Sequence, residues 1–543
     1  MDLVGMLEEP ARRASLEARA LVALTRAGVI GIDSPQRILG IVNAIRDYGP
    51  FGGAAKVSAI RHGRFPAITD EIGQLTFSEF DERIDRLANA LRSRGLGPGS
   101  SIGILCRNHR GPLITAFAAS RGGMTAIWLN TSFSPRQAKE VAEREGVELL
   151  VHDAEFAEMV AGIEPEHGRI ACMTDEHDVD ELDRLFAQGD PKPLPAPKKP
   201  GRIVLLTSGT SGTPKGAPRA EPRGFIVPGS LLERLPMRAR EANVIAPPLF
   251  HGTGLIIALL SISLGANTVL RRRFDAETFL DDIEGNRATG VCVVPVMLQR
   301  VIALGEEAVK RHDLSSLRVV FCAGSALPAE VALKATELLG EVIYNLYGST
   351  EVAVATLATP KDVREAPTSV GKPALGSRVK IYDKEGHELR AGQQGRIFVG
   401  TSMPFEGYTG GGQKDIIDGL LSTGDVGHIG EDGRLYIDGR DDDMIVSGGE
   451  NVFPGEVEEL LVTHQAIADA AAFGVEDEDF GQRLKAYVVL REGQARVSED
   501  EVKKFVKDNL ANYKVPRQVI FIDELPRNPT GKILKRELKQ RED

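Results

Sequence analysis

Hydroxyl, glycine and lysine residues gather in one short segment, Leu205–Gly216, which overlaps the end of an apolar run at Ile203–Leu206. The segment reads LLTSGTSGTPKG, and its hydroxyl residues and glycines surround a single lysine, Lys215. Glycines let backbone N–H groups turn toward an anion, hydroxyls donate further hydrogen bonds, and a lysine adds a point charge. The segment therefore predicts a cradle for a polyphosphate. It differs from a P-loop, because Pro214 stands where that motif has glycine and Gly216 follows the lysine.

Further motifs follow in order along the chain. They are Pro247–Gly254 (PPLFHGTG), Tyr347–Glu351 (YGSTE), Ser422–Asp425 (STGD) with Gly439-Arg440, Ser447–Pro454 (SGGENVFP) and Asn528–Lys532 (NPTGK). Together with the hydroxyl-rich segment, this series resembles the adenylate-forming superfamily, which includes acyl-CoA synthetases, luciferases and the adenylation domains of peptide synthetases. The resemblance runs from roughly residue 60 to the C-terminus.

The resemblance implies a reaction that activates a carboxylic acid. A carboxylate reacts poorly with a thiol because its leaving group is poor, and coupling to AMP removes this obstacle. The carboxylate attacks the α-phosphorus of ATP, pyrophosphate leaves, and the acyl-adenylate then passes its acyl group to CoA. The protein contributes positioning and charge neutralisation. We expect an ATP- and Mg²⁺-dependent carboxylic acid–CoA ligase that acts on a medium- or long-chain fatty acid.

The resemblance assigns most motif residues to ATP or AMP. The residues expected to contact the nucleotide are Thr207, Ser208, Gly209, Thr210, Ser211, Lys215, Gly324, Ser325, Ala326, Tyr347, Gly348, Thr350, Asp425, Arg440 and Lys532. Tyr347 would stack on the adenine ring, opposite Gly324–Ala326. Asp425 would accept hydrogen bonds from the ribose hydroxyls, and Arg440 would donate to the same sugar.

Thr350, Glu351 and Lys532 are the expected catalytic residues. Thr207 and Glu351 would share Mg²⁺, because this ion binds through few protein oxygens together with phosphate. Thr350 would bond to an α-phosphate oxygen, and Lys532 would bridge the carboxylate and the α-phosphate. Taken alone, Glu351 also fits a helix cap after Ser349, and Lys532 also fits a solvated surface lysine.

The acyl and CoA sites are implied in the same way. The residues that would border the acyl pocket are His251, Gly252, Phe321 and Gly348. For His251, a packed or capping role is the alternative. Asp442 occupies the hinge position of the family, where the C-terminal domain would turn between the two half-reactions. That turn would withdraw Lys532 and bring in Gly448 and Gly449, where glycine allows close passage of a pantetheine arm.

Three other functions are alternatives. An adenylating enzyme with a different acceptor, such as a carrier-protein thiol or an internal hydroxyl as in β-lactone synthetases, would differ only in its second step. A non-enzymatic nucleotide-binding protein would not need Lys215, Glu351 and Lys532 together. A hydrolase is suggested by the GxSxG match at 99–103. A nucleophile elbow, however, needs a strand before the serine and a helix after it, and the local pattern here is the reverse.

Composition excludes further classes. The 66 Lys and Arg residues and the 77 Asp and Glu residues give a net charge of −11, which argues against a nucleic-acid binder. The four cysteines form no CxxC pair and predict free thiols in a reducing compartment. The histidines show no zinc-ligand spacing. No signal peptide is evident, and the apolar stretch at 255–270 is too short and too polar for a membrane span. We expect a cytoplasmic protein, and peripheral membrane contact and a homodimer stay open.

The elements that must position these residues alternate between strand and helix from about residue 75. Thr76 and Glu79 predict a capping box before a helix that Gly95 ends, and Ser134-Pro135 begins another. Strand patterns occur at 102–106, 126–129, 148–151, 203–206, 244–246, 267–270, 290–294, 317–322 and 341–345. This alternation predicts an α/β fold with largely parallel sheets covered on both faces.

The texture changes after residue 375. Short strands at 379–382, 395–399 and 433–437 predict a small β-barrel-like subdomain, and beyond Arg440 the pattern predicts a small α+β domain. We therefore expect three parts. Residues 1–55 form an extension without an assigned role, with a helix at 17–26. Residues 56–440 form the AMP-binding domain, with two α/β sheet subdomains and the β subdomain, and residues 441–543 form a mobile C-terminal lid.

Overall fold

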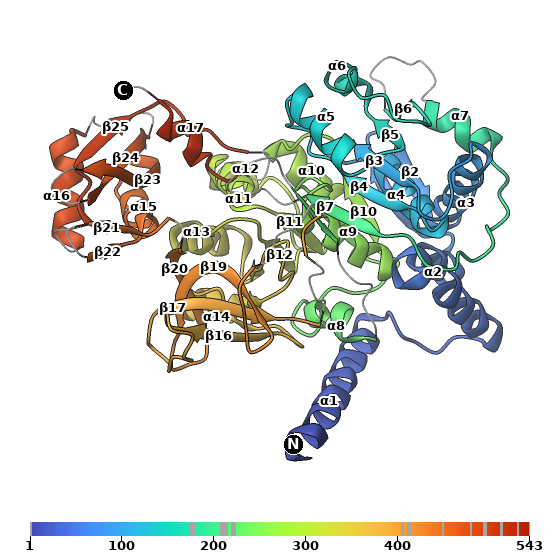
Figure 1. Ribbon diagram of the computed structural model, residues 1–543, viewed down its shortest axis with the longest axis horizontal. Coiled ribbons are helices and arrows are strands. Elements are labelled where there is room, and N and C mark those ends of the chain that lie inside the picture. Colours follow the sequence, from blue (N-terminus) through green and yellow to red (C-terminus); the bar gives the residue numbers. More distant parts are fainter. Residues whose placement is uncertain are drawn as a thin grey trace.

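The computed structural model describes residues 3–173, 181–206, 215–218, 224–402, 407–409, 414–441, 443–447, 450–477, 481–491, 493, 497–510, 514–528 and 531–541. The strands in these residues form four sheets (Figure 1). Two are large, mostly parallel and covered by helices, one is antiparallel, and one belongs to a small C-terminal unit. The expected α/β fold with an antiparallel β part and a small α+β C-terminal domain is confirmed.

The first large sheet has the strand order β6-β5-β3-β4-β7-β8 and is parallel except for β8. Its strands are β3 (Ser101–Leu105), β4 (Thr125–Trp128), β5 (Leu149–His152), β6 (Arg169–Ala171), β7 (Ile203–Leu206) and β8 (Gly216–Pro218). The helices along this part of the chain are α3 (Phe77–Ser93), α4 (Arg110–Arg121), α5 (Pro135–Arg144), η1 (Ala154–Phe156), α6 (Ala157–Val160) and α7 (Glu181–Gln188). The capping box expected at Thr76 is confirmed, and Ser134, which was expected to begin a helix, forms a second capping box, so local hydrogen bonds set where α3 and α5 begin.

Two residues of this sheet need separate mention, the serine of the GxSxG match and the tryptophan. Ser101 begins strand β3 and is preceded by helix α3, so the GxSxG match is not a nucleophile elbow. Trp128, the only tryptophan in the chain, ends β4 with 1% of its surface exposed and pairs with Leu205 of β7.

The second large sheet has the order β15-β14-β13-β12-β11-β9-β10-β1-β2. Its strands are β1 (Pro66–Asp70), β2 (Gly73–Thr76), β9 (Ala242–Ile245), β10 (Asn267–Leu270), β11 (Gly290–Val293), β12 (Val319–Cys322), β13 (Ile343–Tyr347), β14 (Thr356–Ala358) and β15 (Lys372–Pro373). Its helices are α8 (Ile226–Leu232), α9 (Gly252–Ser263), α10 (Ala276–Gly285), α11 (Pro295–Ala303), α12 (Glu306–Val309), α13 (Ala329–Leu339) and α14 (Pro360–Glu365). The central strands β1, β10, β9, β11, β12 and β13 are parallel, so their carboxyl ends share one edge.

The antiparallel sheet follows, as the change of texture predicts. It comprises β16 (Arg378–Tyr382), β17 (Gly395–Gly400), β18 (Ile416–Ile417), β19 (Leu420–Ile429) and β20 (Leu435–Arg440). The C-terminal unit contains β21 (Ile445–Ser447), β22 (Glu450–Val452), α15 (Pro454–Val462), β23 (Ile467–Asp477), β24 (Gly481–Leu490), α16 (Glu499–Asn509), β25 (Gln518–Phe521) and α17 (Lys535–Lys539). It has its own apolar core between β23, β24, α15 and α16. Figure 1 shows this unit in red, set apart from the two large sheets.

The N-terminal residues form two long helices, α1 (Leu3–Ala27) and α2 (Pro35–His62). The helix expected at 17–26 lies within α1. The domain boundary expected at residue 55 falls inside α2, so the N-terminal part is continuous with the large domain. Gly49 interrupts α2 with a φ of 72°, and Pro50 follows it, so the helix bends here. Helix α1 packs on α8, and α2 packs on α3, α4 and α9.

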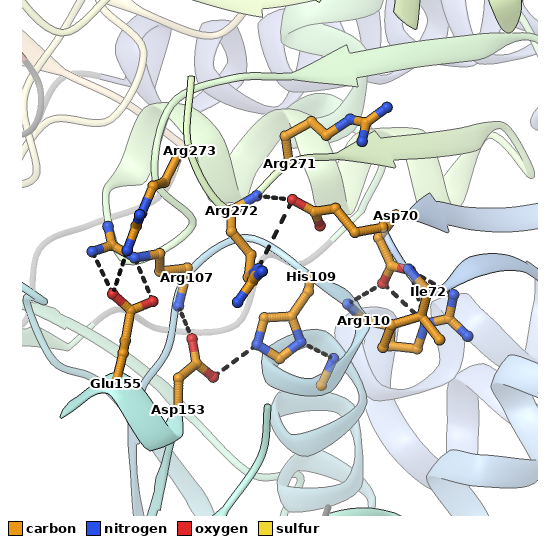
Figure 2. A network of polar contacts seen from close by, with 12 residues as sticks. Asp70, Ile72, Arg107, His109, Arg110, Asp153, Glu155, Arg271, Arg272 and Arg273 are labelled. Carbon is orange, nitrogen blue, oxygen red and sulfur yellow. Dashed lines mark hydrogen bonds and ion pairs between the residues drawn. The ribbon is translucent and has the colours of Figure 1, made fainter. Parts of the chain in front are cut away.

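Charged side chains join the two large sheets where β3 ends (Figure 2). Asp70 of β1 accepts hydrogen bonds from the backbone N–H and the guanidinium of Arg110, with the shortest at 2.5 Å, and its side chain is 0% exposed. At the rim, Glu155 pairs with Arg107 of the first sheet and with Arg273 of the second. Because buried charges are tolerated only when they are paired, these contacts fix how the two sheets meet.

A second buried cluster lies beside this junction. Ligand atoms of Cys106, His109, Asp153 and Cys172 all lie within 4.8 Å of one another, a grouping that sequence spacing did not indicate. The backbone N–H of Gly111 donates to His109 Nδ1, so the proton is on Nε2, which lies 2.9 Å from Asp153 Oδ1. With both ring nitrogens engaged, the imidazole has no lone pair for a metal ion. We therefore interpret the cluster as structural.

We expect Asp70→Asn to lower the free energy of unfolding by about 3–5 kcal/mol, because it leaves the Arg110 guanidinium buried without its counter-charge. Urea unfolding followed by circular dichroism measures this change. Glu140→Gln, which removes an exposed partner of Arg136, is the matched control and is expected to leave stability unchanged. Equal stabilities for the two variants would contradict the role given to Asp70.

Candidate active site

The carboxyl ends of β11, β12 and β13 open onto one large cavity. Gly324–Ala326 follow β12, and Tyr347 ends the neighbouring strand β13, so both groups reach the cavity wall, as expected for open parallel sheets. Gly348 must be glycine, because a Cβ there would lie 1.8 Å from the carbonyl oxygen of Ala353. The sharp turn after β13 thereby directs Thr350 and Glu351 to the same cavity.

Asp425 and Arg440 lie directly opposite each other in the register of β19 and β20. Arg440 Nη1 is 3.4 Å from Asp425 Oδ1, and the Tyr347 hydroxyl donates to Asp425 Oδ2 at 2.5 Å. Burial raises the pKa of Asp425 and outweighs the opposing effects of Tyr347 and Arg440. Burial also raises the pKa of Tyr347, helped by the charge of Asp425. The antiparallel sheet thus places Asp425 and Arg440, which are expected to contact the ribose, next to Tyr347, which is expected to contact the adenine.

Glu351 is held by two hydroxyl groups. Ser349 donates to Oε2 at 2.7 Å, and Tyr408 donates to Oε1 at 2.6 Å. Burial acts to raise the pKa of Glu351, but the Tyr408 hydrogen bond, the charge of Lys414 and the Ser349 hydrogen bond together lower it below its ordinary value. Glu351 is therefore an ionised, half-buried carboxylate at the cavity wall.

The end of the hydroxyl-rich segment is anchored beside Glu351. The backbone N–H of Gly216 donates to Thr409 Oγ1 at 2.8 Å, and the same hydroxyl donates to Glu145 at 2.8 Å. Lys215 Nζ lies 6.0 Å from the centre of the Tyr408 ring. Thr207, Ser208, Gly209, Thr210 and Ser211 lie outside the described residues. Of the expected cradle, the structure therefore describes Lys215, which faces the same tyrosine ring whose hydroxyl donates to Glu351.

Lys532 reaches the cavity from the C-terminal unit. Its side chain is exposed, and its loop is closed by hydrogen bonds of 2.9 Å in both directions between Lys532 and Asn528. Gly531 packs against Val296 at the start of α11, where a Cβ would lie 2.2 Å from that side chain. The loop thus touches the second sheet's helices next to the cavity. Asp442, Gly448 and Gly449 lie outside the described residues.

His251 and Gly252 lie at the N-terminal end of α9 and line the cavity. Burial lowers the pKa of His251 to about 4, and its Nε2 has no hydrogen-bond partner among the described residues. The imidazole is therefore neutral. Phe321 is 1% exposed and packs in the apolar core, so its place at the acyl pocket stays a prediction. The backbone after β12, at Ala323 and Gly324, lines the cavity.

Sequence reasoning missed several residues that build this site. Tyr408, Thr409 and Lys414 lie in a glycine-rich stretch without strand or helix periodicity, so their partners had no local signal. Asn108 is a further case. Its side chain bonds the carbonyl of Pro247 and the backbone N–H of Leu249 at 2.9 and 2.8 Å, which holds the loop before His251. Asn108 could have been identified from its position just after a buried parallel strand, because functional residues often lie at the carboxyl ends of such strands.

Comparison with known proteins identifies the family of this chain. Residues 56–409 match the model of the AMP-binding enzyme family, and residues 456–532 match the AMP-binding enzyme C-terminal domain. No helix in the described part of the chain is long and apolar enough to cross a membrane.

Individual relatives cover most of the chain. A feruloyl-CoA synthase from Amycolatopsis sp is 32% identical over 89% of this chain and 96% of its own length. The fatty acid–[acyl-carrier-protein] ligase ScoC from Streptomyces coeruleorubidus is 31% identical over 88% of this chain and 93% of its own. The structure of o-succinylbenzoate CoA synthetase from Bacillus subtilis, in complex with an acyl-adenylate intermediate, aligns with a TM-score of 0.79 at 27% identity, covering 90% of this chain and 98% of that chain.

We expect the imidazole of His251 to stay neutral at pH 6, with a pKa of about 4 that nitrogen-15 NMR can measure. Because the unfolded state binds a proton near pH 6.5 and the folded state does not, His251 makes the protein less stable as the pH falls from 6.5 to 4. His251→Gln should weaken this pH dependence of urea unfolding. A His251 that titrates near pH 6.5 would contradict its burial.

Proposed function

Since this chain belongs to the adenylate-forming family of AMP-binding enzymes, we propose that it is an ATP- and Mg²⁺-dependent fatty acid–CoA ligase. The observation that carries this proposal is the convergence of Glu351, Tyr347, Asp425 and Lys532 on one cavity. These residues come from two separate folded units. Such an arrangement fits a reaction whose main demands are orientation and charge neutralisation around a triphosphate.

In this proposal, the nucleotide binds to the cavity wall that the antiparallel sheet and β13 form. The Tyr347 ring is fixed by its hydroxyl contact with Asp425, so it offers a preset face for adenine stacking. Asp425 keeps further lone pairs for a ribose hydroxyl, and Arg440 on the opposing strand donates to the same sugar. Lys215 brings a positive charge to the phosphates.

The donor set around Glu351 fits a magnesium ion. Its carboxylate is ionised, each oxygen receives one hydroxyl hydrogen bond, and lone pairs remain for a hard cation. Glu351 would hold the ion with Thr207, a residue that lies outside the described part of the chain. When bound, Mg²⁺ supplies charge neutralisation to the phosphates. The Tyr408 and Ser349 hydroxyls keep the carboxylate in one orientation.

The two half-reactions use different residues in this proposal. Lys532, on a loop seated against Val296, donates to the acid carboxylate and the α-phosphate during adenylation. The C-terminal unit then turns at Asp442 and presents Gly448 and Gly449 to the pantetheine arm of CoA. The second candidate is the same first step with a carrier-protein thiol as the acceptor, because a similar relative is a fatty acid–[acyl-carrier-protein] ligase. CoA consumption separates the two.

The reaction is tested by acid-dependent exchange of pyrophosphate into ATP in the absence of CoA. We expect exchange in the wild type, with acyl-CoA, AMP and pyrophosphate as products once CoA is added. Lys532→Ala should reduce exchange about 10²–10³-fold, yet it should convert preformed acyl-adenylate and CoA to thioester at near the wild-type rate. Formation of ADP and phosphate would overturn the proposal. Equal losses in both half-reactions would overturn the separate roles.

Tyr408→Phe should shift the acid limb of the pH profile for pyrophosphate exchange to higher pH. The Tyr408 hydrogen bond lowers the pKa of Glu351, so its loss raises that pKa and a higher pH is needed to ionise the carboxyl group. Tyr382→Phe is the matched control, because it removes a hydroxyl–carboxylate hydrogen bond to Asp418, a residue that does not line the cavity. An unshifted profile in Tyr408→Phe would show that Glu351 ionisation does not limit the reaction.

A further inference from the structure

The N-terminal helices form one wall of the same cavity. Six residues of α2 line it, all of them apolar: Ile41, Ile45, Pro50, Phe51, Ala54 and Val57. Residues from the end of α1, from α8 and from α9 complete the lining on this side. The extension that sequence analysis left without a role therefore borders the site region directly.

Helix α9 supplies the facing surface and starts at the active site. Gly252, Ile256, Leu259 and Ser263 recur at helical spacing, line the cavity and are each partly exposed. The opposite face of α9 is buried in the core; Ala258 on that face is 0% exposed. An open apolar stripe thus runs along α9 from His251 to its last turn.

The N-terminal wall is held by specific polar contacts. Arg19 of α1 pairs with Glu233 at 2.5 Å, and Glu17 accepts from the backbone N–H of Phe225 at 2.9 Å. Ser58 of α2 donates to the carbonyl of Ile262 in α9 at 2.6 Å. The bend at Gly49 and Pro50 divides α2, and residues from both halves, Ile41 and Ile45 before the bend and Ala54 and Val57 after it, line the cavity.

The apolar lining formed by α2, α8 and α9 favours an apolar ligand. Apart from Thr253 and Ser263, the lining residues of α2, α8 and α9 carry no hydrogen-bonding side chain, and Ser263 already donates to the carbonyl of Leu259. A second carboxylate or a ring hydroxyl placed here would lose water without gaining a partner. A flexible apolar chain has no such cost.

We propose that the hairpin of α1 and α2 completes a channel along α9 for the alkyl chain of a long-chain carboxylic acid. This inference rests on the proposed function and names its substrate class. The twelve residue steps from His251 to Ser263 span about 18 Å at 1.5 Å each. An extended chain covers about 3.3–3.6 Å per three bonds, so the stripe matches roughly 15 bonds. The channel therefore suits acids of about 14 to 16 carbons.

The test measures kcat/KM for pyrophosphate exchange across straight-chain acids from hexanoate to palmitate. In the wild type, each methylene that enters the channel should raise kcat/KM by about fourfold until product release or diffusion limits it. Ala54→Trp places a large ring on the channel wall of α2. It should cost at least about tenfold with palmitate and leave hexanoate within about twofold, because a six-carbon acid held at His251 would end before the later turns of α9, where α2 packs.

Val42→Trp is the matched control, since Val42 lies on the same helix, is 54% exposed and does not line the cavity. It should keep the wild-type profile. If thermal unfolding shows that Ala54→Trp is destabilised, Ala54→Leu replaces it and should show a smaller loss in the same direction. A wild type that exchanges no carboxylic acid would overturn the proposed function. A wild type with exchange that is flat across chain length, or the same profile in the Ala54 and Val42 variants, would overturn the channel alone.

Discussion

The structure depends on a run of three polar residues, Asn108, His109 and Arg110, buried where β3 ends. None of them can stay buried unless its hydrogen bonds are satisfied, and each finds its partner in a different segment. His109 bonds Asp153 within the first sheet, Arg110 reaches Asp70 in the second, and Asn108 holds the loop that leads to His251. Because these groups must be paired, one short stretch of backbone fixes how the two sheets meet and where the loop before His251 lies.

Two carboxyl groups on the cavity wall show how their surroundings shift a pKa in opposite directions. Asp425 and Glu351 are both largely removed from water, yet the pKa of Asp425 is raised and that of Glu351 is lowered. Burial dominates for Asp425. For Glu351 the hydroxyls of Tyr408 and Ser349 and the charge of Lys414 prevail. Asp425, whose surroundings suit contact with hydroxyl groups, and Glu351, whose surroundings suit contact with a cation, thus lie on the same cavity wall.

Much of the fold was predictable because its signals are local. The capping box at Thr76, the helix that begins after Ser134 and the short apolar strands appear where the pattern places them. Most of the described motif residues also reach one cavity, because parallel strands present their ends at a common edge. Phe321 could not be assigned from the sequence, since β12 is buried on both faces and alternation then carries no information on which side chain meets a cavity.

The N-terminal hairpin escaped prediction for a related reason. An apolar stripe on a helix reads the same whether it meets a core or borders an open channel, and only the tertiary structure distinguishes them. The hydrogen bond of Tyr408 to Glu351 could not be predicted either, because the two residues are 57 positions apart in sequence and no periodic pattern relates them.

Trp128 has a practical consequence for spectroscopy. As the sole tryptophan, buried in β4 against the strand that leads into the hydroxyl-rich segment, it makes intrinsic emission a local reporter of the first sheet. A change in β7 would alter this emission, whereas unfolding of the C-terminal unit, which has its own core, would leave the emission unchanged. A fluorescence trace and a calorimetric trace of the same sample would therefore report on different parts of this molecule.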